Sequence, residues 1–152
     1  MIELPRECRD EVVAQAREAA PREACGLLGG TFGDDHSRVE SVHRAENVAA
    51  APRSEYEADP EEAYRVLRRI ESGGEELVGF YHSHPSGPAR PSATDAARAY
   101  WPDRSYVIVI LDGGGTGDDG TDDDGTDDGG PSVGSWRWRD DGFERETVRI
   151  DD

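Results

Sequence analysis

The chain has 152 residues, a length typical of one domain that can bury most of its apolar surface in a single core. Its formal net charge is −17, from 34 acidic and 17 basic residues, and it contains no lysine, so it lacks the basic stripe that nucleic-acid binding requires. Two cysteines exclude a disulfide framework, and the absence of a signal peptide or a membrane-length apolar run favours a cytoplasmic protein.

The first third of the chain predicts two strands around a helix, then a third strand. Residues 1–4 begin a strand, and apolar residues at helical spacing predict a helix over Glu7–Ala20. A glycine-rich strand is expected over Glu23–Phe32, and an imperfectly alternating one over Arg38–Val48. If the strand begins at Glu23, the side chains of Glu23 and Cys25 face the same way. Cys25 is then either a small buried core residue or a neighbour of a functional site.

A second helix and the central strand follow a proline-containing loop over Ala49–Pro60. Asp59-Pro60-Glu61-Glu62 has the cap, proline and acidic first turn of a helix start, and Gly73-Gly74 ends that helix. The apolar residues within Glu75–Tyr81 predict a strand. His82 and His84 end this strand on one face, because residues i and i+2 of a strand point the same way. Two imidazoles on one face can bind one metal ion.

Ser92 and Asp95 start the next predicted helix, Ser92–Ala99, after a loop that contains prolines. Serine at the cap and an acid three residues later also form a capping arrangement, so the pair has a purely structural interpretation. Both interpretations can hold together, because Asp95 in the first turn can reach back to the histidines. Zinc accepts two histidines and a carboxylate and keeps a fourth position open in catalytic sites.

The last third of the chain predicts a covered strand, an insert and a hairpin. Residues Ser105–Leu111 are apolar throughout, as in a strand buried on both faces. The Gly, Asp and Thr residues at about 113–130 cannot bury apolar surface, which predicts a disordered acidic insert. Alternation of Trp136 and Trp138 with arginines predicts a strand over Val133–Arg139, paired with a second over Phe143–Ile150.

The motif His82-Ser83-His84-Pro85, with seven residues to Ser92 and two more to Asp95, resembles the signature of the JAMM (MPN+) metalloprotease family. The upstream segment Glu23-Ala24-Cys25-Gly26-Leu27-Leu28 is also similar to that family. The resemblance covers roughly residues 1 to 111. It implies an α/β fold, the single-domain MPN fold over residues 1–152, with a curved mixed sheet flanked by helices in a deaminase-like three-layer arrangement.

The same resemblance implies a chemistry. One Zn²⁺ per chain would be held by His82, His84 and Asp95, Glu23 would be the general base, and Ser92 would stabilise the oxyanion. Short archaeal members are desampylases, which cut small archaeal ubiquitin-like modifiers (SAMPs) from target proteins after their terminal Gly-Gly, and the chain resembles these most. The alternatives are a non-catalytic MPN scaffold and a zinc hydrolase acting on another small amide.

The composition of the chain agrees with an archaeal origin. The net charge would destabilise a compact chain by self-repulsion in dilute salt, whereas molar salt shortens the Debye length to ~3 Å and screens the repulsion. Absence of lysine with an excess of aspartate is similar to the composition of halophilic archaeal proteins. An ordinary acidic protein is the alternative interpretation.

Overall fold

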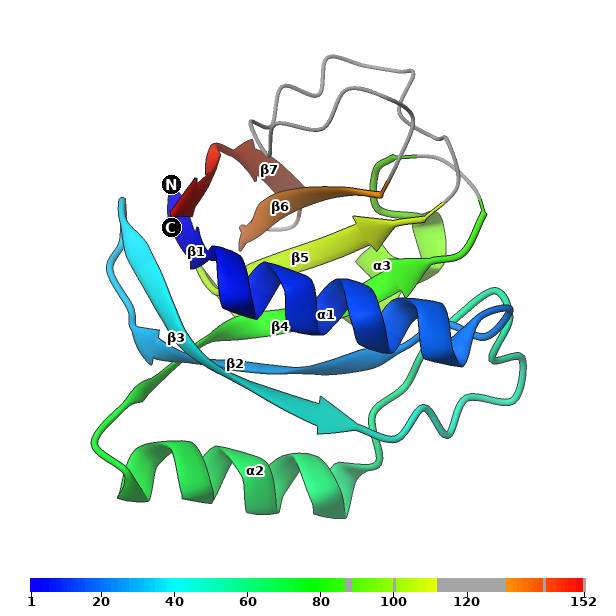
Figure 1. Ribbon diagram of the computed structural model, residues 1–152, viewed down its shortest axis with the longest axis horizontal. Helices are drawn as coiled ribbons and strands as arrows, with labels where there is room; N and C mark the ends of the chain where they lie inside the picture. Colours follow the sequence, from blue (N-terminus) through cyan, green and yellow to red (C-terminus); the bar gives the residue numbers. More distant parts are fainter. Residues whose placement is uncertain (87–88, 100, 112–130, 141, 152) are drawn as a thin grey trace.

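The computed structural model describes residues 1–86, 89–99, 101–111, 131–140 and 142–151 (Figure 1). The acidic insert expected at about 113–130 lies outside these residues. None of the helices among the described residues is long and apolar enough to cross a membrane. The elements in chain order are β1 (Ile2–Pro5), α1 (Arg6–Ala19), β2 (Cys25–Thr31), β3 (Ser37–Ala45), α2 (Pro60–Ser72), β4 (Glu76–His84), α3 (Ala93–Arg98), β5 (Ser105–Ile110), β6 (Ser132–Arg139), β7 (Gly142–Glu146) and β8 (Val148–Asp151).

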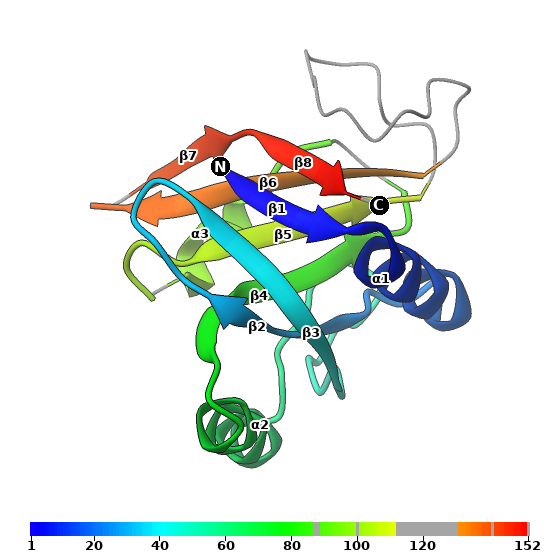
Figure 2. The ribbon, with the colours of Figure 1, turned by 60° about the vertical axis from the view of Figure 1, so that its left-hand side comes forward.

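The strands form one mixed sheet in the order β7-β6-β5-β4-β2-β3-β1-β8. The pairs β4–β5, β1–β3 and β1–β8 are parallel, and the remaining neighbours are antiparallel. The strand β4 lies inside the sheet, between β2 and β5, so its backbone is held on both sides. Figure 2 shows the strong twist of this sheet. The expected α/β class and curved mixed sheet flanked by helices are confirmed.

Helices cover both faces of the sheet because neighbouring strand residues point to opposite sides. Leu28 and Val78 pack with Val12 of α1, whereas Leu27 and Leu77 pack in a second core with residues of α2. The views agree with this assignment, since α1 and α2 lie on different sides of the central strands (Figures 1 and 2). The chain therefore has three layers. The alternation along β4 is interrupted where its pairing with β2 shifts register, so Leu77 and Phe80 both pack in the core of α2, whereas Val78 and Tyr81 both pack in the core of α1.

The prediction of one strand over Phe143–Ile150 is wrong. The hairpin β6–β7 forms as expected, but the chain leaves it after Glu146 and continues as β8, which pairs in parallel with β1. The physical reason is a long-range partner that local alternation cannot reveal. Ile2 pairs with Val148 in this register, both side chains are buried, and the Ile2 N–H donates to the Thr147 carbonyl at 2.9 Å.

A buried ion pair joins these last strands to the rest of the sheet. Arg137 Nε lies 2.9 Å from Glu146 Oε1, and the two side chains are 2% and 6% exposed. The other Glu146 oxygen accepts hydrogen bonds from the hydroxyls of Ser105 and Ser135. Burial alone would raise the pKa of Glu146, but these hydroxyl bonds and the Arg137 charge outweigh it and lower that pKa.

The Glu146→Gln variant tests this ion pair. It leaves the Arg137 charge buried without its partner, so we expect a loss of about 3–5 kcal/mol in unfolding free energy at pH 7. Since the folded pKa of Glu146 is lowered, the stabilisation is present above the unfolded value, ~4.3, and disappears as the pH falls through the folded value. Denaturant unfolding at constant salt should therefore show the gap between wild type and variant closing below about pH 4.

The neighbouring exposed Glu144, which pairs with Arg139 at the surface, gives a matched control. Glu144→Gln should change the unfolding free energy by less than about 1 kcal/mol. An equal loss in both variants, or a gap that does not depend on pH, would contradict the assignment.

Candidate metal centre

Two histidines project from the end of β4 into the layer that contains α2. The strand continues through both residues, as the alternation predicts, and their side chains are buried, with 1% of His82 and 4% of His84 exposed. Phe80 precedes them on the same face, while Tyr81 packs in the core under α1. The edge-to-face rings of His82 and His84 have centroids 5.1 Å apart.

Asp95 reaches the histidines from the first turn of α3. Ser92 is the N-cap of this helix: its Oγ accepts from the Asp95 N–H at 3.0 Å, and Asp95 Oδ2 accepts from the Ser92 N–H at 2.8 Å. The same Oδ2 lies 3.1 Å from His82 Nε2 and 3.3 Å from His84 Nε2. The capping interpretation is thus confirmed. The same carboxylate also contacts both histidines, so the two interpretations hold together. The cap fixes the carboxylate at the point where both rings converge.

Glu23 arrives from a different direction. The strand expected from Glu23 begins only at Cys25, because the backbone of Glu23 bonds to a loop instead of to a strand: its N–H donates to the Pro52 carbonyl at 2.7 Å. Ser83 anchors the next residue, since the Ala24 N–H donates to Ser83 Oγ at 2.8 Å and the Ser83 N–H donates to the Ala24 carbonyl at 3.1 Å. The middle residue of His82-Ser83-His84 therefore ties the strand of the histidines to the segment of Glu23.

The four side chains form one buried cluster. Each of Glu23, His82, His84 and Asp95 offers a ligand atom, and these atoms all lie within 4.8 Å of one another. Among the described residues, Glu23 Oε1 and His82 Nδ1 are buried without a hydrogen-bond partner. A buried polar atom without a partner is costly, and a cation removes that cost for a carboxylate. Two imidazoles and one or two carboxylates are a donor set that fits a metal site.

The charge states also suit a cation. Burial lowers the pKa of His82, which favours the neutral ring that a ligand needs. Burial would raise the pKa of Asp95, but its bonds from His82, His84 and the Ser92 N–H lower it overall, so Asp95 is an anion. Burial is also the main reason that the pKa of Glu23 is raised to about 7, and the negative charge of Asp95 adds to it. A carboxyl group with that pKa can exchange a proton near neutral pH.

Cys25 lies close in sequence but belongs to the core. Its register partner on β4 is His82, so it shares that face of the sheet, yet its Sγ donates to the Ala45 carbonyl at 3.7 Å. It packs among apolar residues of β2, β4 and α2, and burial raises the pKa of its thiol to about 12. The core interpretation is confirmed for this residue.

Two further residues contact the site, although no sequence pattern predicts the contact that either one makes. The Tyr56 ring stacks on His82, with centroids 4.2 Å apart and planes 18° from parallel. The Asn47 amide donates to the Glu23 carbonyl at 2.9 Å. Both come from residues 46–59, the connection between β3 and α2, which has no regular periodicity. The prolines and acids of this segment indicate a loop and give no signal for contacts across the sheet.

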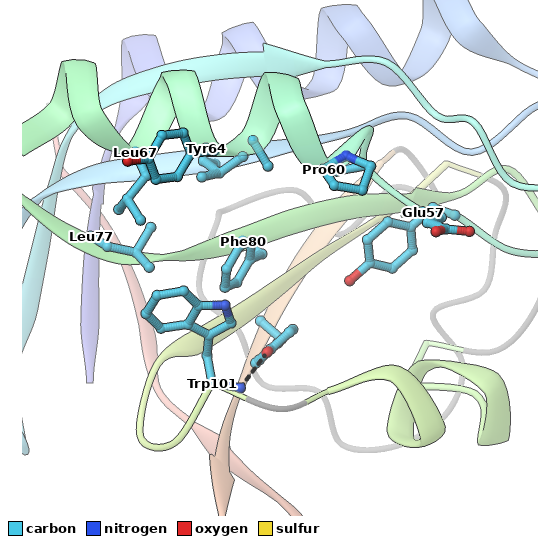
Figure 3. A pocket seen from close by; sticks show the side chains of 12 residues that line it. Glu57, Pro60, Tyr64, Leu67, Leu77, Phe80 and Trp101 are labelled. Atoms are coloured by element: carbon cyan, nitrogen blue, oxygen red, sulfur yellow. Dashed lines mark hydrogen bonds between the residues drawn. The ribbon is translucent and has the colours of Figure 1, made fainter.

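A mostly apolar pocket of about 730 Å³ lies beside the cluster, between α2 and the sheet (Figure 3). Tyr56 joins the two sites, since it both lines the pocket and stacks on His82. The figure shows Leu67 and Tyr64 of α2 above Leu77 and Phe80 of β4, with Trp101 closing the other side. The lining residues are Leu27, Tyr56, Glu57, Ala58, Pro60, Ala63, Tyr64, Leu67, Leu77, Phe80, Trp101 and Tyr106.

Sequence comparison places the chain among known proteins. The profile of a family described as prokaryotic homologues of the JAB domain matches residues 5–119. The desampylase of Haloferax volcanii is 47% identical over 116 residues, which are 74% of this chain and 82% of that protein. A probable TtuB-protein conjugate cleaving protease of Thermus thermophilus is 37% identical over 113 residues, 74% of this chain and 72% of that protein.

Solved structures agree on the fold. A protein from Desulfitobacterium hafniense superposes with a TM-score of 0.80 at 33% identity, covering 99% of this chain and 92% of that one. A JAB1/MPN domain protein from Archaeoglobus fulgidus superposes with a TM-score of 0.55 at 17% identity over 99% of both chains. The second likeness concerns the fold alone, and it shows that the three-layer arrangement described above is that of MPN domains.

Proposed function

Because the chain belongs to the family of prokaryotic JAB-domain homologues and is a JAMM-type hydrolase, we propose that it is a zinc-dependent isopeptidase that removes ubiquitin-like modifiers from proteins. The observation that carries the proposal is the buried Glu23 carboxyl group, without a hydrogen-bond partner at Oε1, beside two histidines and an aspartate. The similarity to a desampylase favours small archaeal modifiers as the substrates.

We assign the roles residue by residue. His82, His84 and Asp95 would hold one Zn²⁺, and Glu23 remains outside that set as the proton carrier. A bound zinc ion supplies Lewis acidity toward a water molecule and toward the carbonyl group of the scissile bond. The alternative of a non-catalytic scaffold is disfavoured because no member of the cluster is missing.

The proton path follows from the position of Glu23. Its carboxylate takes a proton from the attacking water, which forms a bond to the carbonyl carbon at the modifier's C-terminal glycine. The Ser92 hydroxyl donates a hydrogen bond to the oxyanion that forms on that carbonyl. Glu23 then gives its proton to the departing lysine amine as the carbon–nitrogen bond breaks. The products are the modifier with a free carboxylate and the target with a free amine.

The pocket supplies the contact with the modifier. It meets the metal centre at Tyr56, so an extended tail with its last glycine at the metal can place a preceding apolar side chain between α2 and β4. The exposed ring of Tyr64, 59% exposed on α2, lies at the border of this pocket. A modifier with an apolar residue a few positions before its Gly-Gly fits this arrangement.

Glu23→Gln tests the function. The substitution keeps the shape of the side chain and removes its ability to accept a proton, so we expect kcat to fall by about 10³-fold with zinc still bound one per chain. The measurement is cleavage of a modifier–lysine conjugate in molar salt, with metal analysis of the same samples. Chelation of the metal should abolish cleavage and Zn²⁺ should restore it. Glu18→Gln, an exposed position on the far side of the sheet, is the control that keeps full activity.

Cleavage that survives Glu23→Gln would refute the role of Glu23. Zinc-loaded wild type that binds the conjugate without cutting it would favour the scaffold instead.

Substitutions at Ser92 separate capping from oxyanion binding. Ser92→Gly costs only a few tenths of a kcal/mol as a cap but removes the hydroxyl, so kcat should fall about 100-fold while the melting temperature changes little. Ser92→Thr keeps the hydroxyl and should retain most of the activity. If the glycine variant cleaves at the wild-type rate, Ser92 is a helix cap and nothing more.

Tyr64→Ala examines the pocket. Because the ring is exposed, its removal should leave stability nearly unchanged and raise KM for the conjugate about tenfold, with kcat within twofold. Tyr64→Phe keeps the ring and loses only the hydroxyl, which accepts a hydrogen bond from Arg68, so KM should stay near the wild-type value. Steady-state kinetics at matched salt would decide, and an unchanged KM in the alanine variant would remove Tyr64 from the substrate site.

A further inference from the structure

Asn47 lies at the centre of the segment that connects β3 to α2, residues 46–59. It forms an isolated antiparallel bridge with Ala58, and the Val48 N–H donates to the Glu57 carbonyl at 2.8 Å, so the two ends of the segment are held together. The side chain is half-buried and points into the interior of this loop. It comes from neither the sheet nor a helix, and none of the roles proposed above uses it.

The Asn47 amide uses all of its hydrogen-bonding capacity. Its Nδ2 donates to the carbonyl of Glu23 at 2.9 Å and to that of Glu55 at 3.1 Å. Its Oδ1 accepts from the N–H of Ala49 at 3.0 Å and from that of Glu57 at 3.1 Å. A side-chain amide has two donors and two lone pairs, so this one is fully satisfied. Such complete pairing is typical of a side chain that fixes the backbone around it.

These bonds hold two functional side chains at once. One donor fixes the backbone carbonyl of Glu23 itself, while the bonds to Glu55 and Glu57 bracket Tyr56 on both sides. These bonds hold the Tyr56 ring stacked on the His82 ring, at a centroid distance of 4.2 Å. Among the residues that the structure describes, Asn47 therefore links the proton carrier and the ring that covers a metal ligand.

The same loop holds Glu23 at its other backbone group, since the Glu23 N–H donates to the Pro52 carbonyl at 2.7 Å. Glu23 precedes β2, so no strand pairing fixes it directly. His82, His84 and Asp95, in contrast, are held by β4 and by the cap of α3, whereas the four hydrogen bonds of the Asn47 side chain end on backbone atoms outside these two elements. Two supports thus exist, one for the metal ligands and one for the base.

We propose that Asn47 is a positioning residue for the hydrolytic reaction, one that sets Glu23 and Tyr56 against the metal centre through the loop 46–59. The inference rests on the proposed function for its kinetic consequence. It makes a separate statement about structure: loss of the two N–H donations releases the Glu23 backbone and the Tyr56 ring while the metal ligands stay in place.

Asn47→Asp is the sharpest test, because it is isosteric, keeps both acceptors and replaces the two donations by repulsion between oxygens. We expect kcat on the modifier–lysine conjugate to fall about 100-fold, the loss typical of a reacting group displaced by about 1 Å, with KM and Zn²⁺ affinity within about threefold of wild type. The metal-free protein gives a second readout. The ring current of Tyr56 shifts the His82 ring protons in NMR spectra, and this shift should be reduced in the variant.

Gln15→Ala is the matched control. Gln15 is another buried amide that donates to a backbone carbonyl near Glu23, that of Cys25 at 3.1 Å, but from α1 on the opposite face of the sheet. Its loss should reduce stability and leave kcat of the folded enzyme within about twofold. Asn47→Ser, which introduces neither charge nor bulk, is the second variant should the aspartate variant fail to fold, and the same changes are expected from it.

The proposal is overturned if the Asn47 variants keep the wild-type kcat and the wild-type His82 ring shifts. It is equally overturned if Zn²⁺ affinity falls in parallel with kcat, or if Gln15→Ala lowers kcat as much. An inactive wild type with an Asn47-dependent His82 shift would refute the proposed function and leave the positioning role standing.

Discussion

The physical constraint on which this structure depends is the burial of two carboxyl groups and two imidazoles within one small volume. Glu23 and Asp95 are 5% and 6% exposed, and each would be repelled by the other if both were ionised without a cation between them. The protein alone relieves only part of this cost. Asp95 stays ionised because three N–H or ring-nitrogen contacts hold it, whereas Glu23, which has a buried oxygen without a partner, has its pKa raised to about 7. This difference between the two carboxyl groups agrees with the roles proposed above, Asp95 as a metal ligand and Glu23 as the proton carrier.

The sheet makes this cluster possible because it places the polar groups at the end of β4, beyond the apolar residues of that strand. The inner strand β4 pairs with β2 from Glu76 to His82 and with β5 from Gly79 to His84, so its last side chains can be polar without weakening the strand. The parallel partner β5 requires a crossover after His84, and that crossover brings α3 and its capping box back to the end of β4. Functional groups gather outside the carboxyl end of the parallel strand for the same reason in other open α/β sheets.

Much of the fold and of the site could be predicted from the sequence. The predictions that were wrong share one physical reason. His82 and His84 follow from alternation along a strand, and the helix beginning at Pro60 follows from its cap, proline and acids, because each signal is local. The meeting of Glu23 with the histidines was implied by resemblance, not by any spacing within the chain. The errors arise at long range: β8 leaves the predicted hairpin for β1, and Glu23 bonds to Pro52 instead of extending β2. No short window contains both partners of such contacts.

Different parts of the fold hold Glu23 and the other three residues of the cluster, so the position of Glu23 can change separately from theirs. The proposed metal ligands lie on the central strand and at a helix cap, which are parts of the fold itself. Glu23 stands on a segment before β2 that is held by Ser83 on one side and by the loop 46–59 on the other. A change at Asn47 would move the proposed base without contacting the proposed ligands, since its two donations and its bond from Glu57 join backbone atoms of residues 23, 55 and 57. If the proposed roles hold, substitutions in this loop alone would abolish the reaction and leave the metal bound, which would turn an enzyme of this fold into a binding module.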